Sequence, residues 1–309
     1  MKIKLIFSLA LASLLSIGNI VAQETKDTTT KLGGTFKPYT SNEEPIVLEN
    51  AQLSVIYEFK HEVFNNKDVS FFVDTMQLVS GSQYSIYFDR NNSSRRKAFS
   101  DYFRKDDPPK VWMPESYPDF LEMATIDDNV FIPQKVGDTY ELYKDRNKNY
   151  ITVMDYDDSE FSDELFFYYE EQMSPIAWEV HEDTTSILGY ICNKATCDFE
   201  GRSYTAWFTL DIPINDGPYK FYGLPGMIMK VEDSEDIFHF TAIGLEKLDD
   251  TEIIIQSKDE FEKMTKSEYF KIKIRMQQNN TVFYRSGALL HFSNKKDGIV
   301  YTPIEITKN

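Results

Sequence analysis

Hydrophobic and polar residues alternate with a period of two along much of this chain, the pattern of β-strands with one buried face. In residues 52–63, for example, Leu53, Val55, Tyr57 and Phe59 fall on one face and mostly polar side chains on the other. The pattern predicts that the chain opens as a β-meander and continues with more strands. The further predicted strands cover residues 71–79, 83–88, 149–154, 165–169, 227–231, 237–243 and 251–255, with shorter pieces after residue 280.

The most regular stretch, residues 187–233, predicts an antiparallel hairpin. Residues 187–197 and 203–212 have the composition of strands, and the short glycine-containing segment 198–202 connects them. In the second strand Tyr204, Ala206, Phe208 and Leu210 alternate with a set that includes Trp207. We expect one set to face the core and the other to face a second layer, a ligand or water.

A loop rich in glycine and proline follows the hairpin. Six such residues occur within residues 213–226, which excludes a regular strand because proline lacks an N–H and glycine serves positive-φ positions. The loop also contains Tyr219, Phe221, Tyr222 and Leu224. We therefore expect it to pack on the sheet as an ordered lid or turn.

Two segments show helical spacing of apolar residues instead. Residues 91–107 predict one helix, whose basic residues 95–97 are interpreted as a solvated face, with an anionic-ligand site as the alternative. Residues 258–278 predict a second helix with Ser257 as its cap and a break near Thr265. The predicted fold class is mainly β, or β-rich α+β: a curved antiparallel sheet or meander with one or two helices packed on it.

Residues 189–228 contain a long, ordered set of glycine, proline, aromatic and charged positions. The set comprises Gly189, Tyr190, Cys192, Lys194, Ala195, Gly201, Arg202, Tyr204, Ala206, Trp207, Ile212, Pro213, Gly217, Pro218, Gly223, Leu224, Pro225, Gly226 and Ile228. This pattern resembles the GLPGLI family of Bacteroidetes envelope proteins, with Met227 in place of the usual leucine, a volume-conserving change. The resemblance implies a secreted protein of unknown function and carries over no catalytic residue. A more distant resemblance, at the level of the fold, is to LolA-type curved sheets.

The N-terminus has the pattern of a secretory signal peptide. Residues 1–22 combine Lys2 and Lys4 with an apolar run and a small residue, Ala22, before the expected cleavage position. Residues 23–45 are interpreted as a disordered lead-in, which leaves residues 46–309 as a single β-rich domain of the GLPGLI type. Because no cysteine lies near the cleavage position, we expect a secreted protein, periplasmic or associated with the outer membrane but not lipid-anchored.

The charge balance is strongly acidic. The chain has 33 Lys and Arg residues against 50 Asp and Glu residues, a net charge of −17, which opposes binding to a phosphate backbone. No run of ~18 apolar residues after the signal peptide predicts a membrane span. The expected partners are therefore an envelope protein or an apolar ligand, with no nucleic acid and no transmembrane segment.

The two cysteines, Cys192 and Cys197, lie five positions apart. In a regular strand this spacing puts their side chains on opposite faces and ~16 Å apart, too far for a disulfide. Free thiols are therefore the favoured interpretation. A disulfide across a bulge is the alternative, because the expected compartment is oxidising. The spacing is not that of a CxxC redox motif.

The sequence contains no motif that identifies a metal, cofactor or catalytic centre. None of the four histidines lies in an HExxH or similar ligand pair, and no GxSxG, P-loop or dinucleotide-binding motif occurs. Asp155, Asp157 and Asp158 are weak candidates for Ca²⁺ ligands, but their segment lacks the EF-hand glycine and glutamate spacing, so a solvated loop is favoured. We expect no cofactor and assign no catalytic residue.

The GLPG segment admits two interpretations. It is either a tight turn with Leu224 held in the core or a surface contact that presents aromatic residues to a partner protein or an apolar ligand. For the second interpretation, the candidate binding residues are Trp207, Tyr219, Phe221, Tyr222, Gly223, Leu224, Pro225 and Gly226.

The favoured functional hypothesis is a non-enzymatic envelope protein that binds a partner or an apolar ligand through its curved sheet and GLPG loop. The alternative is a periplasmic hydrolase that uses carboxylates the sequence does not identify. A pocket in which histidine and carboxylate side chains converge would favour the hydrolase. A concave aromatic face without titratable groups would favour binding.

Overall fold

The computed structural model describes residues 45–65, 68–93, 138–157, 165–279, 281–283, 289–291, 299–300 and 304–305. Several predictions concern residues outside these ranges: the signal peptide, nearly all of the lead-in, most of the helix at residues 91–107, and Asp158. Strands account for 59% of the structure and helices for 8%, so the predicted mainly-β class is confirmed.

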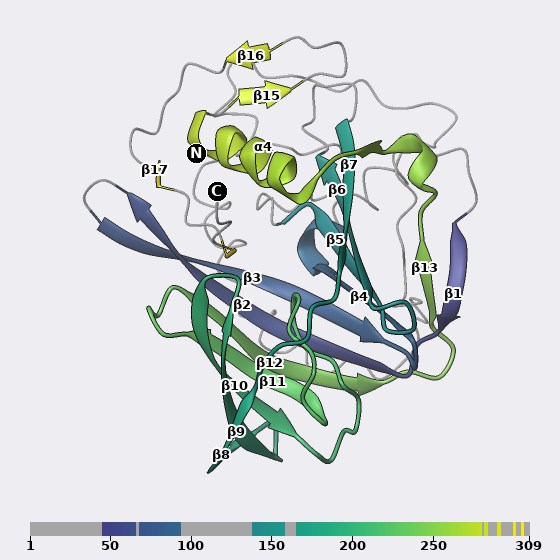
Figure 1. Ribbon diagram of the computed structural model, residues 1–309, viewed down its shortest axis with the longest axis vertical. Helices are drawn as coiled ribbons and strands as arrows, with labels where there is room; N and C mark the ends of the chain where they lie inside the picture. The colour runs from purple at the N-terminus through teal and green to yellow at the C-terminus, as the bar shows by residue number, and fades with distance from the viewer. Residues whose placement is uncertain are drawn as a thin grey trace, which may run out of the picture. The chain divides into compact units, whose positions relative to one another are not determined.

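Thirteen of the described strands form one large sheet that does not close on itself (Figure 1). Strands β2 to β7 are neighbours in chain order, and so are β8 to β12, so that two meanders meet where β2 pairs with β12. These pairings are antiparallel, whereas the short β14 pairs with β7 in parallel. The strands are β1 (Ile46–Asn50), β2 (Leu53–Asn65), β3 (Asp68–Ser80), β4 (Tyr84–Asp89), β5 (Tyr140–Asp145), β6 (Tyr150–Asp157), β7 (Leu165–Gln172), β8 (Glu179–Ile187), β9 (Tyr190–Phe199), β10 (Arg202–Thr209), β11 (Met227–Asp233), β12 (Phe238–Lys247), β13 (Glu252–Ile255), β14 (Glu262–Lys263), β15 (Thr281–Phe283), β16 (Leu289–His291) and β17 (Ile299–Val300).

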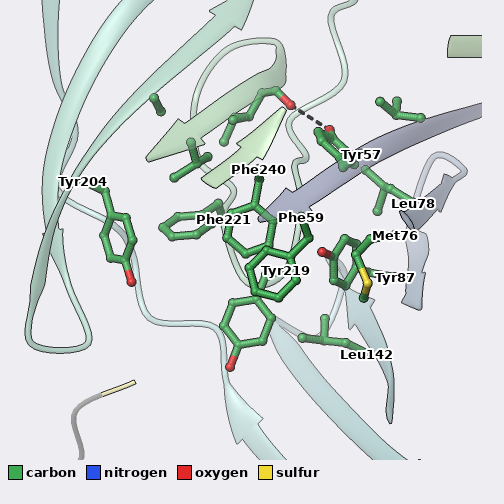
Figure 2. Close-up of a cluster of buried hydrophobic side chains, with 14 of the residues drawn as sticks. Tyr57, Phe59, Met76, Leu78, Tyr87, Leu142, Tyr204, Tyr219, Phe221 and Phe240 are labelled. Carbon is green, nitrogen blue, oxygen red and sulfur yellow. Dashed lines mark hydrogen bonds between the residues drawn. The ribbon is translucent and has the colours of Figure 1, made fainter. Parts of the chain in front are cut away.

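The predicted apolar face of β2 is buried in the main core. The ring of Phe59 stacks on that of Phe240 in the neighbouring β12, with 4.4 Å between ring centroids. The hydroxyl of Tyr57 donates a hydrogen bond of 2.7 Å to the carbonyl of Ile228 at the start of β11, as Figure 2 shows. The two meanders therefore share one core, built from the alternating positions that the sequence pattern identified.

The strand predicted at residues 187–197 is two strands in the structure. Ile187 ends β8, Leu188 and Gly189 form a turn in which both residues have positive φ, and Tyr190 begins β9. The following hairpin, between β9 and β10, is confirmed, with Glu200 and Gly201 at its turn. Residues 179–187 were not predicted as a strand because β8 is polar and its side chains are largely exposed.

The helix predicted at residues 258–278 is interrupted before Lys266, close to the break expected near Thr265. Ser257 caps a short 3₁₀ helix, η1 (Lys258–Glu260), which β14 follows before helix α4 (Lys266–Asn279) begins. Glu268 accepts hydrogen bonds from the N–H and hydroxyl of Thr265, and the Thr265 hydroxyl accepts one from the N–H of Glu268. This capping box starts α4 at its observed position.

Only the start of the other predicted helix is described, and residues 90–93 are helical there. Within the part of the chain that the structure describes, no helix is both long and apolar enough to cross a membrane. Helix α4 lies against β7 (Figure 1), and its Tyr269 and Phe270 join the main core. The helix thus brings side chains from near the C-terminus to the sheet.

Candidate functional site

The glycine- and proline-rich loop between β10 and β11 is packed into the core. Tyr219, Phe221 and Leu224 are buried. The ring of Phe221 meets that of Tyr204 edge-on, with 4.8 Å between ring centroids, in the aromatic cluster of Figure 2. This burial favours the structural interpretation of Phe221 and Leu224, because a side chain without exposed surface presents nothing to a partner.

The glycines of the loop allow it to lie this close to the sheet. A Cβ atom at Gly226 would lie 1.9 Å from the carbonyl oxygen of Thr209, and one at Gly217 would lie 2.8 Å from the Cβ of Ile228. Gly223 has a φ of 101°, a conformation that other residues rarely adopt. The GLPG turn therefore requires glycine on steric grounds alone.

Asp216 fastens the start of the loop to β5. Its carboxylate is buried and lies 2.6 Å from the amine of Lys144 and 2.7 Å from the guanidinium of Arg146, and it accepts a hydrogen bond from Ser80. Burial alone would raise the pKa of Asp216, but the two cations lower it to about 2. The Lys144 amine also donates to the carbonyl of Gly217 at 2.7 Å.

Lys220 fastens the middle of the loop to the C-terminal part of the chain. Its buried amine pairs with the carboxylates of Glu171 and Glu305, and Glu305 also pairs with Lys266 and accepts a hydrogen bond from Tyr219. Although burial opposes the charged amine, the two carboxylates raise the pKa of Lys220. These contacts hold Tyr219 between the sheet and residues 304–305.

Tyr219 forms part of the wall of a pocket with a volume of about 70 Å³. Its lining comes from the sheet, the loop, α4 and the C-terminal segment, and seven of its twelve residues are Phe or Tyr. The lining residues are Phe59, His61, Asp138, Tyr140, Val153, Tyr169, Tyr219, Phe238, Tyr269, Phe270, Lys273 and Ile304.

The pocket shows that the sheet curves. Side chains of β2 and β12 line it together with side chains of β5, β6 and β7, although β12 and β7 are six strands apart in the sheet order. The ring of Tyr140 from β5 meets that of Tyr219 at 72°, with 6.2 Å between ring centroids. The curvature therefore gathers aromatic side chains from distant parts of the chain.

The pocket also contains titratable side chains. The Nε2 atom of His61 lies 3.5 Å from Oδ2 of Asp74, and the His61 ring stacks on Phe59 with 5.0 Å between centroids. Burial and, secondarily, the charge of Asp74 raise the pKa of Asp138 to about 6. The pocket thus combines an aromatic wall with a carboxyl group that titrates near neutrality.

Asp155, a candidate Ca²⁺ ligand, is used for another purpose in the structure. Its carboxylate is buried, lies 2.8 Å from the amine of Lys273, and accepts hydrogen bonds from Tyr269 and Thr139. Burial would raise the pKa of Asp155, but Lys273 and the hydrogen bonds lower it. Asp155 thus ties α4 to β6. In the described ranges, no three His, Cys, Asp or Glu side chains are grouped to hold a metal ion.

The remaining candidate binding residues lie outside the pocket lining. Trp207 and Tyr222 are half-buried, Gly223 and Pro225 are exposed, and Gly226 is buried under β10. Trp207 is on the face of β10 opposite Tyr204, Ala206 and Phe208. Of the eight candidates, the structure therefore places only Tyr219 in the pocket.

Both cysteines are free and buried. Cys192 pairs with Thr185 of β8, and Cys197 pairs with Tyr204 of β10, so five positions of extended strand separate them. Burial raises the pKa of the Cys197 thiol to about 12. A thiol with this pKa stays protonated and is a poor nucleophile at neutral pH.

No local sequence pattern marks the charged residues of the site. His61, Asp138, Lys220 and Lys273 are far apart in the chain and belong to no motif, so nothing in their local pattern indicates that they meet. The one local indication of the site was Tyr219, an aromatic residue of the loop that precedes Lys220 in the sequence.

Comparisons with known proteins identify little beyond the loop. A family model described as a protein of unknown function (Porph_ging) matches residues 200–230, which run from the turn after β9 into β11. No curated protein matches this chain.

Two crystal forms of PNGF-II are similar to the chain in structure. One has a TM-score of 0.43 and 10% sequence identity and covers 71% of this chain and 33% of that protein. The other has a TM-score of 0.43 and 11% identity and covers 74% and 34%. The chain thus spans about a third of the length of these proteins, and a similarity at this level carries no argument about function.

Proposed function

We propose that this protein is a secreted, non-enzymatic protein of the bacterial envelope, of the GLPGLI type, that binds a small ligand in the aromatic pocket of its curved sheet. Secretion rests on the pattern of residues 1–22, with its two lysines, apolar run and small residue at the cleavage position. The GLPG loop contributes to binding by holding Tyr219 in the pocket wall. Leu224 and Phe221 support the loop from within the core.

The observation that carries this proposal is the composition of the pocket. Ligand sites are concave and mostly apolar, with a few polar groups that fix the orientation of the ligand. Seven Phe and Tyr residues line this pocket, against three residues with other ionisable side chains, His61, Asp138 and Lys273. These three meet the condition stated above for a hydrolase, but the aromatic majority of the lining favours binding. One ordered water needs a cavity of ~10–15 Å³, so the volume of this pocket is enough for one functional group or the edge of a ring.

Capture of the native ligand tests the proposal. The full chain would be produced with its signal peptide and purified from the envelope, and small molecules released from it would be identified by mass. Tyr140→Ala removes a ring from the pocket wall, and Tyr150→Ala removes a half-exposed ring that does not line the pocket. A ligand retained by the wild type and by Tyr150→Ala but lost from Tyr140→Ala supports the proposal. Equal recovery from both variants contradicts it.

A hydrolase is the second candidate, because histidine and carboxylate side chains converge in the pocket. His61 lies within 3.5 Å of Asp74, and the pKa of Asp138 is raised to about 6 by burial and by Asp74. A carboxyl group that titrates near neutrality can act as a general acid or base. An imidazole oriented by a carboxylate can do the same.

Turnover measurements separate the two candidates. The protein would be incubated with panels of esters, glycosides and peptides, alongside His61→Gln and Asp138→Asn. His181→Gln is the matched control, because His181 lies on the edge strand β8. Turnover that both pocket variants lose and the control keeps would establish the hydrolase. Turnover unaffected by either pocket variant would rule out this site.

A further inference from the structure

The carboxylate of Glu305 lies in a buried cluster of donors beside the aromatic pocket. The amines of Lys220 and Lys266 both pair with it, the second at 2.6 Å, and the hydroxyl of Tyr219 donates a hydrogen bond to it. The side chains of Lys220 and Glu305 are each 1% exposed. Burial opposes ionisation of Glu305, but Lys220 and then Lys266 lower its pKa, so the carboxylate is charged. The donors therefore form a built site for one carboxylate.

This carboxylate site is continuous with the aromatic pocket. The amine of Lys220 lies 5.3 Å from the ring centroid of Tyr169 and 6.0 Å from that of Phe270. Both rings line the pocket, and so does Tyr219, which is itself one of the donors. Aromatic faces attract cations at such distances. A carboxylate on these donors therefore lies next to the aromatic wall.

The residue before Glu305 contributes an apolar side chain to the same pocket. Ile304 is half-buried and is one of the lining residues. Its carbonyl accepts a hydrogen bond of 3.2 Å from the hydroxyl of Tyr204. Two adjacent residues thus place an apolar group in the pocket and a carboxylate on the donors. An amphipathic carboxylate would make the same two contacts.

Glu305 can leave this site without stranding a buried cation. Lys220 would keep its ion pair with Glu171, and Lys266 would keep Glu171 at 2.9 Å and Glu200 at 2.8 Å. A buried cation that loses its only partner is strongly destabilising, and neither lysine would be in that position. Within the described ranges, the hydrogen bonds and ion pairs of Glu305 are all made by its carboxylate. One exchangeable group therefore holds this residue in place.

We infer that Ile304 and Glu305 occupy the binding site of an apolar carboxylate, which displaces them when it binds. The carboxylate of this ligand pairs with Lys220 and Lys266 and accepts a hydrogen bond from Tyr219, and its apolar part lies in the aromatic pocket. The inference rests on the proposed binding function and names the class of ligand. Residues 304–305 act as an internal competitor that fills the site until the ligand arrives.

Isothermal titration calorimetry with octanoate at pH 7 tests the inference. Octanamide and octylamine are uncharged and cationic probes of the same chain length, and we expect octanoate to bind more tightly than either. Glu305→Gln is expected to raise the affinity for octanoate about tenfold or more, because removal of a competitor increases the fraction of open sites. Glu235→Gln is the control, since it makes the same charge change at a 65% exposed side chain that pairs with Arg202. We expect it to leave the affinity unchanged.

A second substitution removes one of the donors. Lys266 holds both the competitor and the ligand, so Lys266→Gln is made in the Glu305→Gln background, where no competitor remains. We expect octanoate to bind about tenfold or more weakly than to Glu305→Gln alone, since a charge-assisted pair is lost. Lys263→Gln in the same background is the control, because Lys263 is 61% exposed and pairs with Glu170.

Opposite effects of the two substitutions distinguish the inference from a structural role, because a misfolded variant does not gain affinity. Hydrogen exchange adds a readout of displacement. Octanoate should speed exchange at the amide of Glu305 in the wild type. Equal affinity of wild type and Glu305→Gln overturns the inference, and so does the absence of octanoate binding to both. An affinity unaffected by Lys266→Gln also overturns it.

The experiments separate failure of the inference from failure of the proposed function. If the captured ligand is uncharged and its capture depends on Tyr140, the binding function stands and the carboxylate is wrong. If capture does not depend on Tyr140, the proposed function fails. A captured carboxylic acid that is lost from Tyr140→Ala and binds more tightly to Glu305→Gln supports both.

Discussion

The amine of Lys144 lies 2.6 Å from the carboxylate of Asp216, and both side chains are buried. Lys144 belongs to β5, in the first meander, whereas Asp216 opens the loop of the second. Their ion pair therefore joins the two meanders at the base of the GLPG loop. The loop that holds Tyr219 in the pocket wall is fixed by this contact and by Lys220.

Lys144→Met is expected to destabilise the protein. The substitution leaves Asp216 buried with Arg146 as its remaining cation, and removal of one partner from a buried pair costs ~3–5 kcal/mol. Urea unfolding followed by tryptophan fluorescence measures the change. Lys148→Met is the control, because Lys148 is exposed and pairs with Asp145 at 3.6 Å on the surface, where the expected change is below ~1 kcal/mol. Equal stability of the two variants would show that the buried pair is dispensable.

Leu224→Ala separates the two interpretations of the GLPG segment. Leu224 is 1% exposed, and deletion of a buried leucine side chain costs ~2–5 kcal/mol. We expect a large decrease in melting temperature, measured by calorimetry. Leu210→Ala is the matched control, because Leu210 is 56% exposed and its truncation should leave melting almost unchanged. An unchanged melting temperature in Leu224→Ala would contradict the structural interpretation and support surface contact as the role of the segment.

Gly226→Ala is expected to prevent the loop from closing on β10. The added Cβ would lie 1.9 Å from the carbonyl oxygen of Thr209, so the backbone must move. Overpacking of a tight site costs ~1–3 kcal/mol or more. Gly244→Ala is the control, since its Cβ would meet Ile56 at an ordinary 3.5 Å. Soluble yield and urea unfolding measure both variants, and a Gly226→Ala protein as stable as the control would contradict the observed approach.

Asp89→Asn is expected to stabilise the protein at alkaline pH. Burial raises the pKa of Asp89 to about 7 in the folded state, so between pH 4 and pH 7 the folded protein keeps a proton that the unfolded chain has lost. Stability from this group therefore falls as pH rises through that window. Asparagine removes the penalty and can still cap the helical turn. We expect a gain over wild type of ~1–3 kcal/mol at pH 8 that shrinks toward pH 4.

Asp216 has the opposite pH dependence, and it changes outside the pH range that tests Asp89. Its pKa is lowered to about 2, so its contribution is present above pH 4 and is lost as pH falls toward 2. Urea unfolding of Asp89→Asn and wild type across pH 4 to 8 isolates the Asp89 contribution. A stability difference that does not change with pH over this range would contradict a raised pKa for Asp89.

The sequence alone determined the strands with one buried face. Tyr57 and Phe59 were assigned correctly to one apolar face, because strand side chains alternate and a buried face therefore makes every second residue apolar. For Tyr204 and Phe208 the alternation predicted a shared face, and only the structure shows that this face is the buried one. The glycines and prolines of residues 213–226 likewise predicted a tight loop, since the backbone freedom of glycine and the fixed φ of proline are properties of the residues themselves. Strand β8 was missed because it is a polar edge strand, so no alternation of apolar and polar residues marks it in the sequence.

Only the tertiary structure decided which side chains meet. The pocket brings together His61 of a strand, Asp138 of the segment before β5, Tyr219 of a loop and Lys273 of a helix. The curvature of the sheet makes this possible. A pKa near neutrality for Asp138 follows from burial beside Asp74, a property of the folded environment that no local spacing encodes. The strands can therefore be predicted from local sequence patterns, whereas the candidate site arises from contacts between residues that are distant in the chain.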